Sequence, residues 1–177
     1  KNVLSTVLTK EEALMKKITP KLWFDHNAKE AVEFYLSVFP ESRIITTTYY
    51  PEEGLADFQK EFAGKELTLD FELNGNRFTA INAGPEFKFN EAISLMVLCE
   101  DQVEIDNLWE ALTKDGGEES VCGWLKDKYG LSWQVVPTAM NEMMTSGDKE
   151  KIARVTQAFL KMKKFDIETL KRAYEGK

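Results

Sequence analysis

One histidine, His26, and two cysteines, Cys99 and Cys122, are the residues of this sequence whose chemistry is most easily put to catalytic use. His26 follows a short apolar run and precedes a predicted helix, which is typical of an exposed loop residue, with general-base chemistry as the alternative. No Gly-x-Ser-x-Gly elbow is present, so nucleophilic hydrolysis is not expected. Both cysteines fall on predicted strands, which favours small buried side chains over reactive thiolates. The sequence therefore assigns no catalytic residue.

Cofactor motifs are absent as well. The Gly116-Gly117 pair follows a helical pattern and precedes a strand, whereas a dinucleotide or S-adenosylmethionine fingerprint needs a strand, a Gly-rich turn and then a helix. The separation of the two cysteines is not that of a paired-thiolate zinc site, and two cysteines make no disulfide framework. We expect no cofactor, and a reducing cytoplasm as the location.

The charge balance limits the possible partners. Thirty Asp and Glu residues against 23 Lys and Arg residues give a net charge of -7, which disfavours a polyanion such as nucleic acid. The one locally basic stretch, Lys161 to Lys164, is typical of a helix end. No stretch approaches the roughly 20 apolar residues that cross a bilayer. The expected partner is a small molecule, with neither nucleic acid nor membrane involved.

The first half of the chain predicts a strand, a helix and an antiparallel meander. Apolar periodicity marks the helix, alternation marks the strands, and Asn74-Gly75 is a strong two-residue hairpin signal. The segment from Pro51 to Gly64 is a predicted long loop. The expected elements are a strand at 22–24, a helix from Asn27 to about Val38, and strands at 43–50, 67–73 and 77–83.

The second half repeats this pattern. Phe34-Tyr35 aligns with Leu108-Trp109 at an offset of 74 residues, and Gly75 aligns with Gly130 at an offset of 55, so the first copy carries about 19 more residues. Asp101 is the predicted cap of the second helix. The further strands are predicted at 93–99, 119–125 and 131–136, which makes the chain a duplicated βαβββ unit.

The ends of the chain differ from this core. Residues 1–17 are a predicted N-terminal extension, because Met15 resembles a natural start. The paired domain is expected at 18–145, with modules at about 18–84 and 92–138. Residues 146–177 are predicted helices, capped by Asp148 or Ser146 and by Asp166, that pack on the domain or on a partner chain.

Several motifs together resemble the PhnB-like family of the vicinal oxygen chelate superfamily, often described as 3-demethylubiquinone-9 3-methyltransferase. The resemblance covers about residues 18–176. It rests on Thr19-Pro20, Leu22 to Asp25, Ala31 to Tyr35, Gly84-Pro85, Phe87 to Phe89, Cys122 to Asp127, Gly130, Ser132 to Gln134, Val136-Pro137, Leu160 to Lys164 and Tyr174 to Gly176. It implies an α+β fold in which two βαβββ modules form a curved mixed sheet around a small-molecule cavity, commonly in a homodimer.

Metal-using members of that superfamily place a ligand at the start of the first strand and another on the last strand of each module. The corresponding positions here are Pro20, Ser94, Thr79 and Gln134, and a slip of two residues would bring in Asp25 or Asn82. Neither register supplies the histidine and carboxylate set that a divalent ion needs. The resemblance therefore implies a cavity protein that holds no metal.

The aromatic residues Trp23, Trp124 and Trp133 either line the cavity or belong to the core. Asp70 and Glu72 alternate with leucines, so they face solvent or the cavity. The expected function is metal-free binding of a small molecule; the alternative is an enzyme on a quinone-like or aromatic substrate, by methyl transfer or by metal-assisted lyase or dioxygenase chemistry. The predicted cavity residues are Trp23, Asn82, Ser94, Cys122, Trp124 and Gln134.

Overall fold

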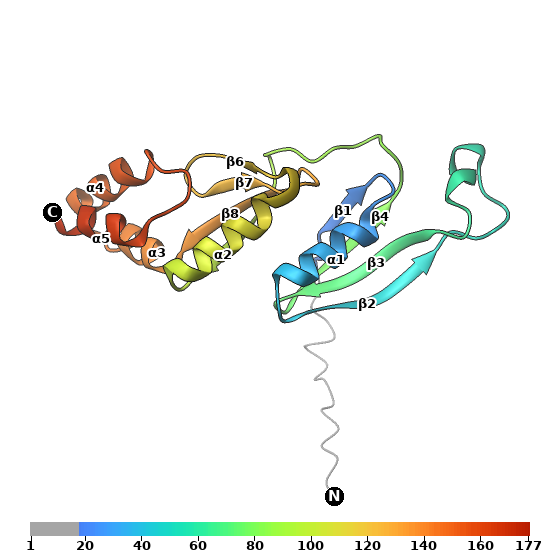
Figure 1. Cartoon of the computed structure of the whole chain (residues 1–177), viewed down its shortest axis with the longest axis horizontal. Helices are drawn as coiled ribbons and strands as arrows, with labels where there is room; N and C mark the ends of the chain where they lie inside the picture. The colour runs from blue at the N-terminus through green and yellow to red at the C-terminus, as the bar shows by residue number, and fades with distance from the viewer. Residues whose placement is uncertain (1–17) are drawn as a thin grey trace, which may run out of the picture.

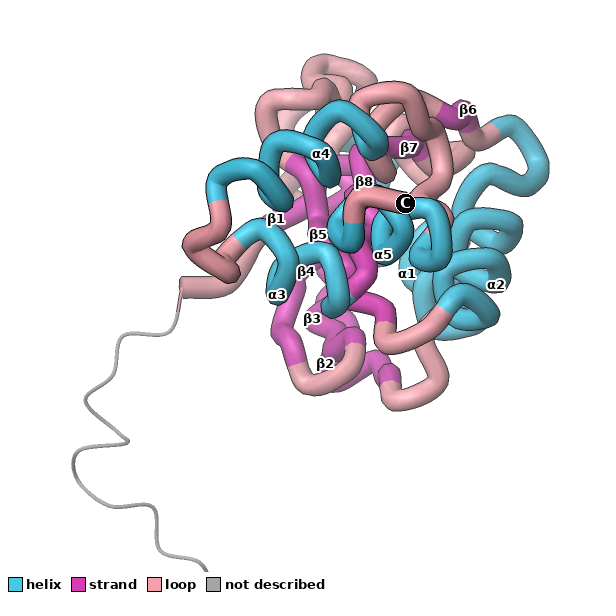
Figure 2. The backbone as a smooth tube through the Cα atoms, turned by 90° about the vertical axis from the view of Figure 1, so that its left-hand side faces the viewer, coloured by secondary structure: helices cyan, strands magenta, loops and turns pink. Residues whose placement is uncertain are grey.

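The computed structural model describes residues 18–177, and the predicted N-terminal extension, residues 1–17, lies outside this range. The described residues form two four-stranded sheets, one from each half of the chain, followed by three helices (Figure 1). In Figure 2, α1 and α2 lie to the right of strands β1, β3, β4, β5 and β8. The predicted α+β fold of two βαβββ modules with C-terminal helices is confirmed.

The first module contains sheet A, with strand order β1-β4-β3-β2, in which β1 is parallel to β4 and the other pairs are antiparallel. The predicted hairpin turn is present, because Asn74 and Gly75 both have positive φ, 44° and 81°, as a two-residue turn of this kind requires. The elements are β1 Lys21–Phe24, α1 Ala28–Val38, β2 Ser42–Tyr49, a 3₁₀ helix at Asp57–Phe62, β3 Glu66–Leu73 and β4 Asn76–Asn82.

The second module repeats this order in sheet B, β5-β8-β7-β6. The duplication is confirmed, because in each sheet the first strand is parallel to the last. Leu22 of β1 lies opposite Ala80 of β4, and Val97 of β5 lies opposite Val135 of β8. The elements are β5 Ser94–Cys99, α2 Gln102–Thr113, a 3₁₀ turn at Lys114–Gly116, β6 Glu118–Glu119, β7 Trp124–Lys126 and β8 Ser132–Pro137.

The predicted single strand at 119–125 is wrong. A turn at residues 120–123 divides it into β6 and β7, with Cys122 and Gly123 both at positive φ, 57° and 78°. Backbone hydrogen bonds from Cys122 N to Met162 O (2.8 Å) and from Gly123 N to Lys163 O (2.7 Å) hold the turn. Its partners lie about 40 positions further along the chain, so local β propensity did not reveal it.

Three helices follow sheet B and form a second small core together with Val136 of β8, against which Cys122 packs. Asp148 caps α4 by accepting hydrogen bonds from Glu150 N and Lys151 N, and Asp166 caps α5 by accepting from Thr169 N. Of the two predicted caps for the first of these helices, Asp148 is therefore the one used. The helices are α3 Thr138–Met144, α4 Lys149–Phe159 and α5 Ile167–Glu175.

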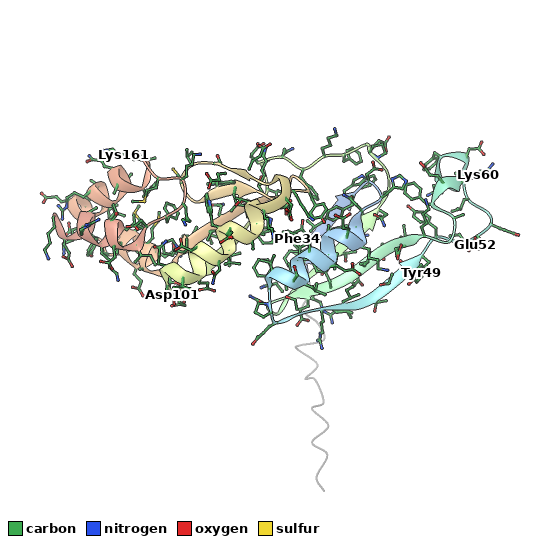
Figure 3. All side chains as sticks on the ribbon, in the orientation of Figure 1. Phe34, Tyr49, Glu52, Lys60, Asp101 and Lys161 are labelled. Atoms are coloured by element: carbon green, nitrogen blue, oxygen red, sulfur yellow. The ribbon has the colours of Figure 1, made fainter. Side chains whose placement is uncertain are left out.

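Each sheet buries one face under its own helix. In sheet A, Leu69 and Phe71 are buried on the side of α1, and in sheet B, Val135 is buried on the side of α2. Asp101 caps α2 at Glu104 N, as predicted (Figure 3). The opposite face of each sheet carries polar and half-exposed side chains. Among residues 18–177, no helix has the length and hydropathy to cross a bilayer.

Candidate functional site

The face of sheet B that points away from α2 carries two rows of side chains. Because residues alternate along a strand, Trp124, Gln134 and Met96 form one row across β7, β8 and β5. Lys126, Ser132 and Ser94 form the adjacent row. An indole, an amide, two hydroxyls and an ammonium group therefore meet on one face. We call it the uncovered face because α2 does not lie over it; only its Val136 end packs against the C-terminal helices.

The Gln134 amide links the two rows. Its Nε2 donates a hydrogen bond of 2.8 Å to Ser94 Oγ. This contact fixes the rotamer of both side chains on a face whose neighbouring apolar residues, Met96 and Leu98, remain about half exposed. The predicted cavity residues Ser94, Gln134 and Trp124 are thus brought together by the fold.

A hollow of about 560 Å³ lies beside β7. Its lining includes Trp124, Lys126 and Ser132 from the uncovered face, Cys122 from the turn, and Glu91 from the segment that joins the two modules. Lys126 forms an ion pair with Glu91. That pair lowers the pKa of Glu91 and raises the pKa of Lys126. The joining segment is therefore tied to the edge of this hollow.

A larger groove of about 1030 Å³ lies between the modules. Strand β5 forms one wall, including Ser94, and the β3–β4 hairpin around Asn74 and Gly75 forms the other. Arg77 and Glu72 give this groove a polar rim. Neither Trp124 nor Gln134 lines it, so the groove meets the candidate site only at its β5 edge.

The corresponding face of sheet A carries Trp23, Thr79 and Asp70. Thr79 Oγ1 donates to Asp70 Oδ1 at 2.7 Å, so Asp70 lies on the face opposite α1, as its alternation with leucines predicts. Trp23 Nε1 donates to Gly84 O at 2.8 Å, and its ring meets Phe87 edge-on at 4.8 Å. Trp23 is therefore already fixed by the joining segment.

Asn82 lies apart from the other predicted cavity residues. It is buried on the α1 side of sheet A, where its Oδ1 accepts from Ala28 N at 2.9 Å and its Nδ2 donates to Glu66 O at 3.0 Å. The side chain thus satisfies a free N–H at the start of α1. This position accounts for its burial without a ligand.

Cys122 and Trp133 are also separated from the uncovered face. Cys122 is half buried in the turn, and its Sγ lies 3.8 Å from Phe159 O, so it reaches only the rim of the smaller hollow. Trp133 is buried beneath α2 with its Nε1 donating to Asp127 Oδ2 at 2.9 Å. Trp133 is therefore a core residue, and it also lines the larger groove between the modules.

His26 lies in the loop that the sequence indicated. Its ring stacks on Phe62 at 4.5 Å between ring centres, and its Nδ1 lies 2.5 Å from Asp25 Oδ1. Glu61 lies 3.6 Å from the other ring nitrogen. These contacts join the loop after β1 to the 3₁₀ helix, and none involves the residues on the uncovered face of sheet B.

The residues at the expected metal positions do not fit a divalent ion. Pro20 offers only its carbonyl, which already accepts from Thr79 N at 3.0 Å, and Ser94 accepts from Gln134. Three neutral side chains at most would surround the ion, whereas transition metals in proteins take imidazole, carboxylate or thiolate ligands. Within residues 18–177, no group of three His, Cys, Asp or Glu residues is placed to hold a metal ion.

Lys126, Ser132 and Glu91 were not predicted as site residues. Two of them could have been found from the strand period, because Ser132 is two positions before Gln134 and Lys126 is two positions after Trp124, on the same face. No local signal places Glu91 there, because it lies in irregular structure and reaches the site only through the folded path of the joining segment.

Two four-stranded sheets of order 1-4-3-2, each covered on one face by the helix of its own module, define a paired βαβββ protein of the glyoxalase and bleomycin-resistance class. Two solved structures share this fold at low identity. PA1353 from Pseudomonas aeruginosa is 18% identical, with a TM-score of 0.57, over 69% of this chain and 97% of that chain. The fosfomycin resistance protein from Listeria monocytogenes is 14% identical, with a TM-score of 0.51, over 73% and 96%.

Residues 16–136 match the family described as 3-demethylubiquinone-9 3-methyltransferase, and the chain belongs to that family. The PhnB protein from Bacillus cereus, which carries the same description, is 36% identical over 70% of this chain and 100% of that chain, with a TM-score of 0.60. A search of curated proteins found no match. Helices α3 to α5 begin at Thr138 and so follow the matched region.

Proposed function

We propose that the protein binds a small organic molecule on the uncovered face of sheet B and uses no bound metal there. The observation that carries this proposal is the placement of Trp124, Gln134 and Ser94 in adjacent rows on the face of sheet B opposite α2, where Met96 and Leu98 remain about half exposed. An aromatic side chain with a few converging polar groups is typical of small-molecule sites. The neutral donors at the superfamily's metal positions favour binding over metal-assisted chemistry.

We further propose that a second copy of the chain closes this site. Strands β1 and β5 are the edge strands of their sheets, and within the described chain each pairs on one side only. An open edge can be extended by a strand from another molecule. Pairing β1 of one copy with β5 of the other would join sheet A to sheet B and place Trp23 near Ser94 and Gln134. The half-exposed Met96 and Leu98 would be covered in such a dimer.

Native mass spectrometry tests both parts of this proposal. Protein purified from its own host without a polyhistidine tag is expected to carry a non-covalent small molecule and to have the mass of a dimer. The Gln134→Ala variant is expected to lose the small molecule while retaining the dimer mass, and Gln59→Ala, in the 3₁₀ helix of the first module, is the matched control. Stoichiometric Mn, Fe, Ni or Zn would contradict the metal-free site, and a monomer mass would contradict the dimer.

Methyl transfer is the second candidate, because the family description names it. Methyl transferases that use S-adenosylmethionine commonly place it at the carboxyl ends of a parallel, doubly wound sheet. Both sheets here are mixed and each is covered by one helix, so the chain's own elements do not form such a site. Calorimetry with S-adenosylmethionine decides the question: measurable binding heat together with a raised melting temperature would favour the transferase.

A further inference from the structure

We propose that the hollow beside β7 takes an uncharged planar ligand through an acceptor oxygen and discriminates against carboxylates. This inference rests on the proposed function, since it names the chemical class that the uncovered face of sheet B would bind. Two unpaired hydrogen-bonding groups and the local charge balance carry it.

The first observation is the hydroxyl of Ser132. This side chain lines the hollow, is only 1% exposed, and its Oγ has no hydrogen-bond partner among the described residues. A buried hydroxyl without a partner costs free energy, on the order of 1–3 kcal/mol. Native proteins rarely leave such a group unsatisfied. A ligand oxygen in the hollow would provide the missing partner.

The second observation is the indole of Trp124. The other three tryptophans each donate from Nε1: Trp23 to Gly84 O, Trp109 to Glu119 Oε1 and Trp133 to Asp127 Oδ2. No residue from 18 to 177 accepts from the Nε1 of Trp124. An indole N–H can donate but cannot accept. Trp124 is half buried, so its Nε1 is free to donate to a ligand in the hollow. A ligand atom that pairs with it must be an acceptor, and the flat face of the ring favours a planar molecule.

The third observation is the charge around Lys126. Its ammonium pairs with Glu91, and Glu118 lies directly opposite Lys126 in the β6–β7 pair. Two carboxylates thus surround one ammonium group, and all three residues line the hollow. A carboxylate ligand would add a third negative charge and would have to displace Glu91. A cationic ligand would suit the charge, but it would bring no acceptor for the indole N–H of Trp124.

The three requirements together select a neutral carbonyl, amide or phenol on a planar ring. Ser132 faces the same side of sheet B as Lys126, its partner across the β7–β8 pair. The joining segment reaches this place through Glu91, so the ion pair closes one border of the hollow. A neutral ligand can enter the hollow without breaking this ion pair, because it does not compete with Glu91 for the ammonium group of Lys126.

Three isosteric probes test the proposal: benzamide, benzoate and benzamidine, which share one shape and carry charges of 0, −1 and +1. Each is titrated into the full-length ¹⁵N-labelled protein, and the indole Nε1–H resonance of Trp124, assigned by its loss in Trp124→Phe, is followed. Benzamide is expected to shift this resonance with at least fivefold higher affinity than either charged probe. Ser132→Ala is expected to weaken benzamide about five- to tenfold, the equivalent of one hydrogen bond, and Ser37→Ala on α1 is the control.

Glu118→Gln provides a second variant that does not remove a proposed ligand contact. It is expected to strengthen benzoate binding and leave benzamide unchanged, because it removes only the charge opposite Lys126. Tighter binding of benzoate or benzamidine than of benzamide to the wild-type protein would overturn the ligand class while leaving small-molecule binding intact. An unshifted Trp124 resonance with all three probes would overturn the inference itself. The proposed function is tested separately, by whether the native mass spectrum shows a bound small molecule.

Discussion

The phenolic hydroxyl of Tyr35 donates a hydrogen bond of 2.9 Å to Oδ2 of Asp127. Tyr35 lies on α1 of the first module, and Asp127 follows β7 of the second, so this bond joins the two halves of the chain. Both side chains are buried. Phe34, labelled in Figure 3, packs at the same place against Tyr129, with 5.8 Å between ring centres. This bond is one of the contacts that join the two modules, together with the stacking of Phe39 on Trp133.

Removal of the Tyr35 hydroxyl is therefore expected to destabilise the protein. In Tyr35→Phe the Asp127 carboxylate keeps its bonds from Trp133 Nε1, Tyr129 N and Leu131 N but loses one donor. We expect a loss of about 1–2 kcal/mol in the free energy of unfolding, measured by urea denaturation. Tyr49→Phe is the control, because Tyr49 is 59% exposed. Equal stability of the two variants would contradict a role for this bond in joining the modules.

The same carboxyl predicts a pH dependence. Burial raises the pKa of Asp127, and the hydrogen bonds from Trp133, Tyr35 and two backbone N–H groups only partly oppose it. The folded state thus holds this proton more tightly than the unfolded state, whose pKa is about 3.9. The stability from this group is present below about pH 4 and is lost as pH rises through the folded pKa.

Comparison with Asp127→Asn, which does not titrate, isolates that contribution. The free energy of unfolding of both proteins is measured from pH 4 to pH 8. The advantage of the wild-type protein over the variant is expected to shrink as pH rises. If the advantage grew instead, the four hydrogen bonds would outweigh burial and the pKa of Asp127 would be lowered.

The sequence predicted those parts of the fold whose signals are local. Asn74-Gly75 marked its hairpin because both residues tolerate positive φ, and Asp101 marked the start of α2 because a carboxylate at that position can accept from the first free N–H groups. The duplication followed from the shared strand and helix periods. Each of these features depends on residues within a few positions of one another, and so the sequence was sufficient.

The parts that were missed depend on distant partners. The turn at Cys122 is fixed by Met162 and Lys163, and the burial of Asn82 by its bond to Ala28 N. The site was predicted in part for the same reason. Trp124 was predicted as an aromatic cavity residue and Gln134 from the superfamily's ligand positions, whereas the contribution of Glu91 depends on where a long irregular segment crosses the sheet.

Asp166 predicts a different pH effect at the start of α5. Its side chain accepts from Thr169 N at 2.6 Å. Hydrogen bonding to the Thr169 side chain and to this backbone N–H lowers the pKa of Asp166. The stability from this group is present above the unfolded pKa of about 3.9 and is lost as pH falls through the lower folded pKa. Asp166→Ala is expected to lose about 1 kcal/mol at pH 7.

Asp166→Asn separates the hydrogen bond from the charge, because asparagine caps helices about as well as aspartate. It is expected to keep most of the stability at pH 7 and to lose the dependence on pH below about 4. Thermal unfolding followed by circular dichroism measures both variants. A loss in Asp166→Asn as large as that in Asp166→Ala would mean that the charge, rather than the cap, stabilises α5.

Gly123, in the turn that borders the candidate site, is expected not to accept a side chain. A Cβ there would lie 2.4 Å from a ring atom of Phe165, and its φ of 78° already disfavours any other residue. Gly130 has a similar φ of 84° but has no atom within 4 Å of the same position. Gly130→Ala therefore reports the backbone cost alone, roughly 1–2 kcal/mol, and Gly123→Ala adds the clash.

We expect Gly123→Ala to be less stable than Gly130→Ala by a further 1–3 kcal/mol or so, as for other substitutions that overfill a packed site, measured by urea denaturation. Because the turn at 120–123 forms one wall of the hollow beside β7, a displaced Phe165 also predicts a shifted Trp124 indole resonance in Gly123→Ala and an unshifted one in Gly130→Ala. Equal stability of the two variants would mean that Phe165 moves aside at no cost, and that helices α3 to α5 do not hold the wall of the site.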